Sequence, residues 1–180
     1  MNHALRPRRL VVALFASVCA GATQAHTGLH GTGAFSIGFM HPLTGMDHLL
    51  AMLALGVWAC SMKARTGRWV MLTFPAMMAV GFMFGKSGDS PSGLEAALAG
   101  SVAVLVLMIL AVRNAQPGIA APMVAFFGLL HGWAHGMEMP ADAASGSYAA
   151  GFLSATIALH LAGFLVARQT RLFSRSRLQD

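Results

Sequence analysis

The stretch FMHPLTGMDHLLAMLALGVW, residues 39–58, decides the fold, because it places ionisable side chains at the head of an otherwise apolar run. These side chains are His41, Asp47 and His48. Ionisable groups are costly inside a membrane, where they usually face the interior of a helix bundle. We therefore expect this stretch to begin a membrane helix whose polar face meets polar groups from other helices.

The composition favours an integral membrane protein. Of the 180 residues, 56% are hydrophobic and 10% are charged, whereas soluble domains carry roughly 25% charged residues. The net charge of +6 does not indicate nucleic-acid binding, because the basic residues lie in short segments between apolar runs. Cys60 is the only cysteine after the first 25 residues, so no intramolecular disulfide is expected there.

The first 25 residues have the pattern of a secretory signal peptide. Three arginines precede the apolar run LVVALFASVCAGA, residues 10–22, and Thr23-Gln24-Ala25 fits the usual cleavage pattern. Cleavage after Ala25 would leave residues 26–180 as a single transmembrane domain. The alternative is an uncleaved anchor helix, and both interpretations direct the chain to a membrane.

Five further apolar runs are long enough to cross a membrane as helices, which takes roughly 17–25 residues each. Short polar stretches that contain Pro or Gly separate them, as turns do. The fold class predicted is all-α, a polytopic membrane bundle of about five helices after the signal peptide. The predicted spans are about 35–62, 69–85, 96–112, 119–137 and 148–167.

The basic residues predict the orientation, since short loops rich in Lys and Arg stay in the cytoplasm. A cleaved signal peptide leaves the mature N-terminus in the periplasm. The first loop, with Lys63, Arg65 and Arg68, is then cytoplasmic, together with Arg113 and the basic tail. Of nine Lys and Arg residues after the signal peptide, only Lys86 lies outside. We therefore predict a cytoplasmic C-terminus.

The fourth span carries the most specific pattern: His131, His135 and Glu138 are related by i, i+4 and i+7. Residues at these intervals project from one stripe of a helix. Two imidazoles one turn apart can bind a divalent ion, and a carboxylate one turn further can join them or accept a second-shell hydrogen bond. A ridge of small residues beside the stripe would let a neighbouring helix approach closely. The ridge consists of Gly128, Gly132 and Gly136.

The first and fifth spans supply the remaining polar groups. On a continuous helix His41 and His48 would share a face, while Asp47 would point about 100° away and could orient an imidazole or bind from the side. Counting about 1.5 Å per residue from the cytoplasmic end places His160 roughly 10 Å up its span and His131 roughly 18 Å. The same count places His48 and His135 at about 21 and 24 Å, with Glu138 and His41 near the outer surface. A staggered series favours an ion path over a structural metal site.

Two of these motifs resemble those of the HupE/UreJ family, small inner-membrane proteins linked to hydrogenase and urease maturation. The family motif HPxxGxDH matches residues 41–48, and FHGxAHGxE matches residues 130–138 with Leu130 in place of Phe. The ALHxAG stretch around His160 also fits. The resemblance implies a bacterial inner-membrane nickel permease, with cobalt as an alternative ion and no permanently bound cofactor.

The end of the chain departs from the family pattern. Family members commonly continue with a further apolar helix, whereas residues 168–180 read RQTRLFSRSRLQD and are too polar to span a membrane. Either a natural five-helix variant or a truncated sequence is expected.

The sequence thus predicts a transporter rather than an enzyme, with a divalent metal ion, most simply Ni²⁺, as its substrate and the lipid bilayer as its surroundings. A second copy of the chain and the proteins of hydrogenase or urease maturation are further candidate partners. The alternatives are a membrane metalloenzyme that activates water or oxygen, and a haem electron carrier with paired histidine ligands. The predicted metal-binding residues are His41, Asp47, His48, His131, His135, Glu138 and His160.

Overall fold

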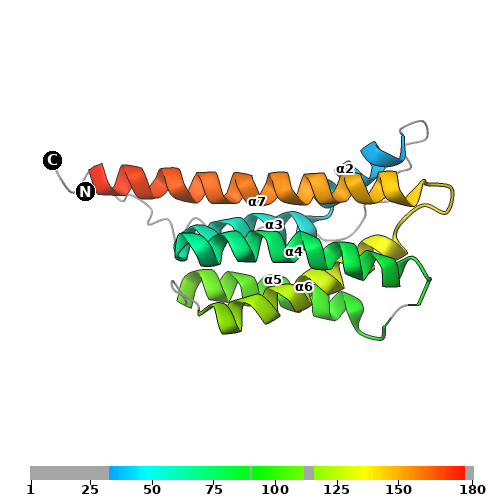
Figure 1. Ribbon diagram of the computed structural model, residues 1–180, viewed down its shortest axis with the longest axis horizontal. Helices are drawn as coiled ribbons and strands as arrows, with labels where there is room; N and C mark the ends of the chain where they lie inside the picture. Colours follow the sequence, from blue (N-terminus) through cyan, green and yellow to red (C-terminus); the bar gives the residue numbers. More distant parts are fainter. Residues whose placement is uncertain (1–32, 90, 112–115, 177–180) are drawn as a thin grey trace.

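The computed structural model describes residues 33–89, 91–111 and 116–176, where all regular structure is α-helical (Figure 1). The all-α class is therefore confirmed for these residues. The predicted signal peptide and Arg113 lie outside them. The helices in the described ranges are α2 (Ala34–Thr44), α3 (Met46–Ser61), α4 (Ala64–Gly85), α5 (Leu94–Ala111), α6 (Pro117–Met137) and α7 (Ser145–Ser176).

Three of these helices are long and apolar enough to cross a membrane on their own. They are α4, α6 and the Ser145–Thr170 part of α7, which correspond to the predicted spans 69–85, 119–137 and 148–167. Their outer surfaces are apolar: Trp69, Leu72 and Ile119 are 60%, 63% and 68% exposed. Large apolar side chains in such number on an outer surface are expected where lipid covers it. The chain is a membrane protein by this criterion.

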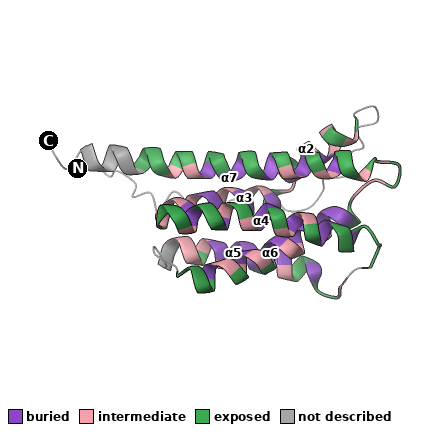
Figure 2. Ribbon diagram, viewed as in Figure 1, coloured by how far each residue is buried: buried purple, intermediate pink, exposed green. Residues whose placement is uncertain are grey.

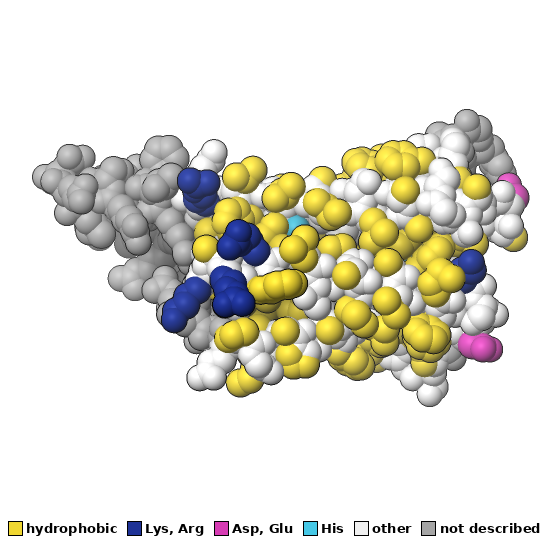
Figure 3. Space-filling view, in the orientation of Figure 1, with side chains coloured by type: hydrophobic (Ala, Val, Ile, Leu, Met, Phe, Trp, Pro, Cys, Tyr) yellow, Lys and Arg dark blue, Asp and Glu magenta, His cyan; other side chains and the backbone are white. Residues whose placement is uncertain are grey.

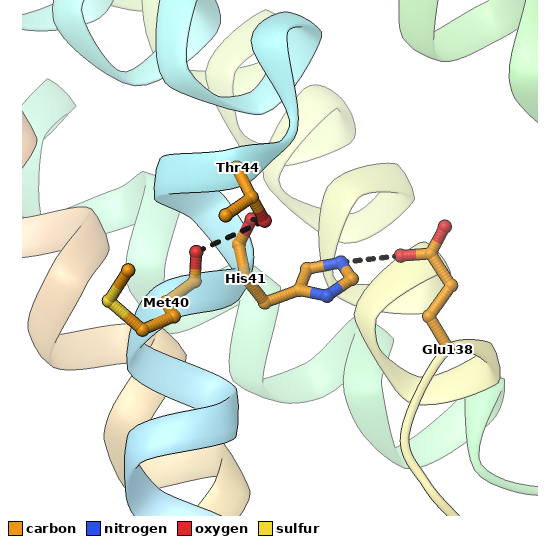
Figure 4. Close-up of polar contacts among 4 residues, drawn as sticks. All are labelled: Met40, His41, Thr44 and Glu138. Carbon is orange, nitrogen blue, oxygen red and sulfur yellow. Dashed lines mark hydrogen bonds and ion pairs between the residues drawn. The ribbon is translucent and has the colours of Figure 1, made fainter. Parts of the chain in front are cut away.

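The first predicted span, about 35–62, consists of two helices and not of one straight helix. α2 ends at Thr44, α3 begins at Met46, and their axes differ by 74°. Gly45 joins them in an extended conformation, with φ −81° and ψ 113°. Glycine is a weak helix former, and the Thr44 hydroxyl donates to the carbonyls of Met40 and His41 (Figure 4). Together α2 and α3 are long enough for one bent span.

The third predicted span, 96–112, corresponds to α5. Its apolar part, Leu94–Ile109, is shorter than the helices that qualify as spans in the described structure, and a full crossing takes about 20 residues. Five spans are therefore not confirmed. The described residues support three, or four if α2 and α3 form one bent span.

The helices pack in two main sets, α4 along α6 and α7 along α2 and α3 (Figure 1). The close approach predicted for the glycine ridge of α6 is confirmed, and its neighbour is α4. A Cβ added at Gly132 would meet the carbonyl oxygen of Met78, and one added at Gly81 would meet that of Leu129. α4 carries no histidine or acidic residue. The helix that the ridge brings close to the histidines therefore carries no imidazole or carboxylate ligand.

Burial and charge follow the layout of a membrane bundle. Figure 2 shows buried residues on the faces that the helices turn toward one another and exposed residues along the outer face of α7. Figure 3 shows Lys and Arg side chains gathered at the end of the molecule where α4 begins, and Asp and Glu side chains at the opposite end. The exposed Lys63, Arg65 and Arg68 lie at the first end, whereas Lys86 follows the other end of α4. The predicted orientation in the membrane stays a prediction.

Candidate functional site

Four histidine rings meet where α2, α3 and α6 come together. Ring centroids lie 4.8 Å apart for His41 and His135, and 4.8 Å apart for His48 and His135. They lie 5.3 Å apart for His48 and His131, and 5.8 Å apart for His41 and His48. We call His41, His48, His131 and His135 the histidine cluster. The bend at Gly45 brings the rings of His41 and His48 into this cluster. They do not lie on a shared face of one straight helix.

Glu138 adjoins the histidine cluster through a contact with His41, which Figure 4 shows. His41 Nε2–H donates to Glu138 Oε2 at 2.6 Å, and the two side chains are 27% and 48% exposed. Glu138 also lines a cleft of about 390 Å³ whose other acidic residue is Glu95. The carboxylate therefore connects the cleft at the acidic end of the molecule to the buried rings, since His48, His131 and His135 are at most 4% exposed.

His131 is held in the way that metal-binding histidines usually are. Its Nδ1–H donates to the carbonyl oxygen of Phe127, one turn earlier on α6, at 2.9 Å. A carbonyl oxygen only accepts, so the proton is on Nδ1 and the lone pair of the neutral ring is on Nε2. Anchoring one nitrogen so that the other can bind a metal is the usual second-shell arrangement.

His135 lies at the centre of the cluster and is fully buried. Among the described residues, neither of its ring nitrogens has a hydrogen-bond partner. Burying polar groups without partners costs free energy, and such groups commonly mark the place of a water or an ion. The ring stacks flat on Phe152 of α7, with centroids 4.6 Å apart and planes 3° apart.

The other two predicted ligands are placed differently. His160, on α7, is 1% exposed and lies outside the cluster. The ring of Phe74, from α4, contacts both His131 and His160, with centroids 5.3 and 5.4 Å away. Asp47 lies in the first turn of α3, and its side chain is not among those described. Among the described side chains, no group of three or more His, Cys, Asp or Glu is arranged so that it could hold a metal ion as it stands.

Sequence reasoning missed the wall that α7 contributes to the site. Residues at four-residue intervals before His160 are fully buried and line the same face: Tyr148, Phe152 and Thr156. The ring of Tyr148 lies 6.3 Å from that of His41, and the Thr156 hydroxyl lies 3.7 Å from Met78 Sδ. Counting back from His160 in steps of four would have found this stripe, because such residues share a helix face.

Comparison with known proteins identifies the chain. The sequence profile of the family described as HupE / UreJ protein matches residues 13–179. The chain belongs to the HupE/UreJ family. It is 35% identical over 159 residues to Protein HupE of Rhizobium leguminosarum bv. viciae, an alignment that covers 88% of this chain and 83% of that relative. No solved structure matches the chain.

The two motifs that suggested the HupE/UreJ family also build the site. The motif over 41–48 supplies His41 and His48, and the motif over 130–138 supplies His131, His135 and Glu138. Segments about 90 residues apart in the sequence thus meet at one place, as the 97-residue separation of His41 and Glu138 shows.

Proposed function

We propose that this HupE/UreJ protein is a permease that carries Ni²⁺ across the bacterial inner membrane into the cytoplasm, where it supplies hydrogenase or urease maturation. The proposal rests on the histidine cluster, whose buried rings lie next to the half-exposed carboxylate of Glu138. Imidazole and carboxylate ligands suit Ni²⁺, but they also suit Co²⁺, Zn²⁺ and Cu²⁺. The choice of nickel rests on the family.

The ion enters at Glu138. Its carboxylate offers negative charge at the edge of the cleft, where Glu95 adds a second carboxylate. Binding there displaces the hydrogen bond that His41 donates to Glu138. The ring of His41 is then free to turn, and Nδ1, the nitrogen that does not donate to Glu138, can bind the ion beside His135, whose centroid lies 4.8 Å away.

The ion then passes between neighbouring pairs of rings. His135 adjoins both His41 and His48, and His48 adjoins His131. A closed site with four ligands would hold the ion tightly, whereas a series of partial sites binds it well enough to enter and weakly enough to leave. The staggered arrangement therefore suits transport.

The inner part of the route is interrupted by an aromatic ring. An ion that leaves His131 meets Phe74 before it reaches His160, since this ring contacts both histidines. Apolar constrictions of this kind act as gates in other channels. Transport through this route requires the ring of Phe74 to turn aside.

The haem alternative has less support. Two histidines that ligate one haem iron lie on opposite sides of the macrocycle. The described rings of the cluster instead contact one another directly, with centroids 4.8–5.8 Å apart, which leaves no room for a macrocycle between them. The metalloenzyme alternative is separated from the permease by experiment, because an enzyme would bind metal without accumulating it.

The proposal is tested by uptake of radioactive nickel into cells that express the chain. The comparison is a His131→Ala/His135→Ala variant present in the membrane at the same level. We expect the variant to fall to the uptake of cells without the protein, and excess unlabelled nickel to compete better than zinc. Uptake by the variant equal to that of the wild type, at matched abundance, would overturn the proposal. Metal bound to the purified protein with no uptake would favour the enzyme.

A further inference from the structure

The way in which His135 is held differs from that of its neighbours. Histidines that bind metals usually donate their second ring nitrogen to a carbonyl or carboxylate, which fixes both the ring plane and the tautomer. His131 does so with Phe127, and His41 bonds Glu138. Within the described residues, both nitrogens of the buried His135 lack such a partner. Some other contact must hold this ring.

Phe152 supplies that contact. Its ring lies parallel to the imidazole within 3°, with centroids 4.6 Å apart, and it is fully buried. Two further rings pack against Phe152, that of Phe82 at 5.3 Å and that of Tyr148 at 5.8 Å. A ring packed on several sides has little freedom to turn, because protein interiors are close-packed.

The backbone of Phe152 is also held in place. A Cβ added at the preceding Gly151 would meet the carbonyl oxygen of Phe35 in α2. A Cβ added at Gly38 of α2 would meet the carbonyl oxygen of Tyr148. Close helix contacts of this kind, which small residues allow, set the position of α7 against α2. The stacking surface is therefore rigid relative to the helix that carries His41.

Stacking and hydrogen bonding constrain a histidine ring in different ways. A hydrogen bond to a carbonyl fixes which nitrogen carries the proton, as it does for His131. Stacking covers a face of the ring and fixes its plane, but both nitrogens lie at the ring edge and either can then carry the lone pair. Two histidine rings, those of His41 and His48, each have their centroid 4.8 Å from that of His135.

We propose that Phe152 is a positioning residue for ion transfer, whose ring holds the plane of His135 while leaving both nitrogens available, so that His135 receives the ion beside His41 and releases it beside His48. The proposal deepens the proposed function and rests on it. Phe152 itself does not touch the ion. It acts through His135.

The first test needs no metal. The protein is labelled with ¹³C and ¹⁵N in histidine, placed in lipid nanodiscs, and the His135 signals are assigned with a His135→Gln variant. Ring protons over an aromatic face are shifted upfield, so we expect an upfield shift of the His135 ring protons that Phe152→Leu removes and Phe152→Tyr retains. His135 signals that do not change in Phe152→Leu would overturn the proposal.

The second test measures Ni²⁺ binding to the same proteins by calorimetry. Loss of an outer-shell partner typically weakens metal binding about 10–100-fold, and we expect a loss of at least about tenfold in Phe152→Leu with recovery in Phe152→Tyr. The matched control is Phe164→Leu, the same substitution on α7 twelve residues after Phe152, where the side chain packs on the apolar core.

The control separates positioning from general packing. We expect Phe164→Leu to keep the wild-type affinity, and an equal loss of affinity in Phe164→Leu and Phe152→Leu would overturn the proposal. A wild-type protein that binds no nickel would contradict the proposed function, while the resonance experiment would still decide whether Phe152 holds His135.

Discussion

The contact between His41 and Glu138 links the cleft to the buried histidine rings. Single substitutions can test this contact. The Nε2–H of His41 donates to Glu138 at 2.6 Å, and the carboxylate is half exposed. The amide of glutamine has nearly the same shape as this carboxylate and can still accept the hydrogen bond. It carries no charge and is a poor ligand for a divalent ion.

We expect Glu138→Gln to reduce nickel uptake by at least about tenfold at low nickel concentration, with a higher apparent KM, because the entry site loses its charged ligand and even an outer-shell carboxylate contributes about tenfold to metal binding. The control is Asp142→Asn, which removes an exposed carboxylate five residues from the end of α6. Initial uptake rates over a range of nickel concentrations measure both. Equal losses in the two variants would show that general negative charge matters, and not Glu138.

The sequence predicted those site residues whose side chains are ionisable, because ionisable groups are rare in membrane helices. His131, His135 and Glu138 stand out because few ionisable groups occur in the apolar runs and their spacing is local to one helix. The spacing from His160 places Phe152 and Tyr148 on the same helix face, but their chemistry does not mark them as part of a site, because an aromatic residue in an apolar helix usually packs against its neighbours. Their role depends on the contact between α7 and α6, which is not encoded in local spacing.

At the scale of the helices, the approach of α4 to α6 sets the position of the two α6 histidines. The two helices meet through glycines, and a Cβ at Gly132 would meet the carbonyl oxygen of Met78. A Cβ added at Gly118, on the same helix, would meet no atom within 4 Å. The pair offers a matched comparison of the same substitution at a packed and at an open position.

We expect Gly132→Ala to lower the free energy of unfolding by about 1–3 kcal/mol, since overpacking forces the helix backbones apart. Gly118→Ala should be neutral or stabilising, because alanine is the better helix former by about 1 kcal/mol. Thermal unfolding of the detergent-solubilised proteins checks both. Equal melting temperatures for Gly132→Ala and the wild type would contradict the close packing of α4 and α6.

The sequence predicted where helices occur better than it predicted where a helix breaks or which helix is its neighbour. The glycine ridge on α6 indicated a close neighbour, but the sequence did not show that the neighbour is α4. The break at Gly45 was missed, because one glycine in an apolar run is compatible with a continuous helix. The predicted span over 96–112 is not confirmed, because the apolar part of α5 within the described residues, Leu94–Ile109, is shorter than the helices that qualify as spans.

At the scale of the whole molecule, charge is separated along the helix axes (Figure 3). Lys63, Arg65 and Arg68 are exposed at the end where α4 begins, and Lys86 is exposed at the end that holds Glu138. If basic loops stay in the cytoplasm, Glu138 and its cleft face the periplasm. The membrane class was predictable from composition alone, whereas the number of spans was not.

We expect a cysteine at residue 86 to react with a membrane-impermeant maleimide added to the periplasmic side, and a cysteine at residue 63 to react only after the inner membrane is permeabilised. The variants are Lys86→Cys and Lys63→Cys, each combined with Cys60→Ser to remove the partly buried native thiol. Labelling of Lys63→Cys and not of Lys86→Cys in sealed membranes would show the opposite orientation. The path would then carry the ion out of the cell.

The central claim is that this chain by itself conducts a divalent ion through the histidine cluster. It is tested most directly by reconstituting the purified protein in liposomes that enclose a nickel-sensitive fluorescent dye. The account predicts that external nickel quenches the dye rapidly with the wild type and only at the rate of empty liposomes with His131→Ala/His135→Ala. Quenching at the same rate by both proteins, or by neither, would contradict it.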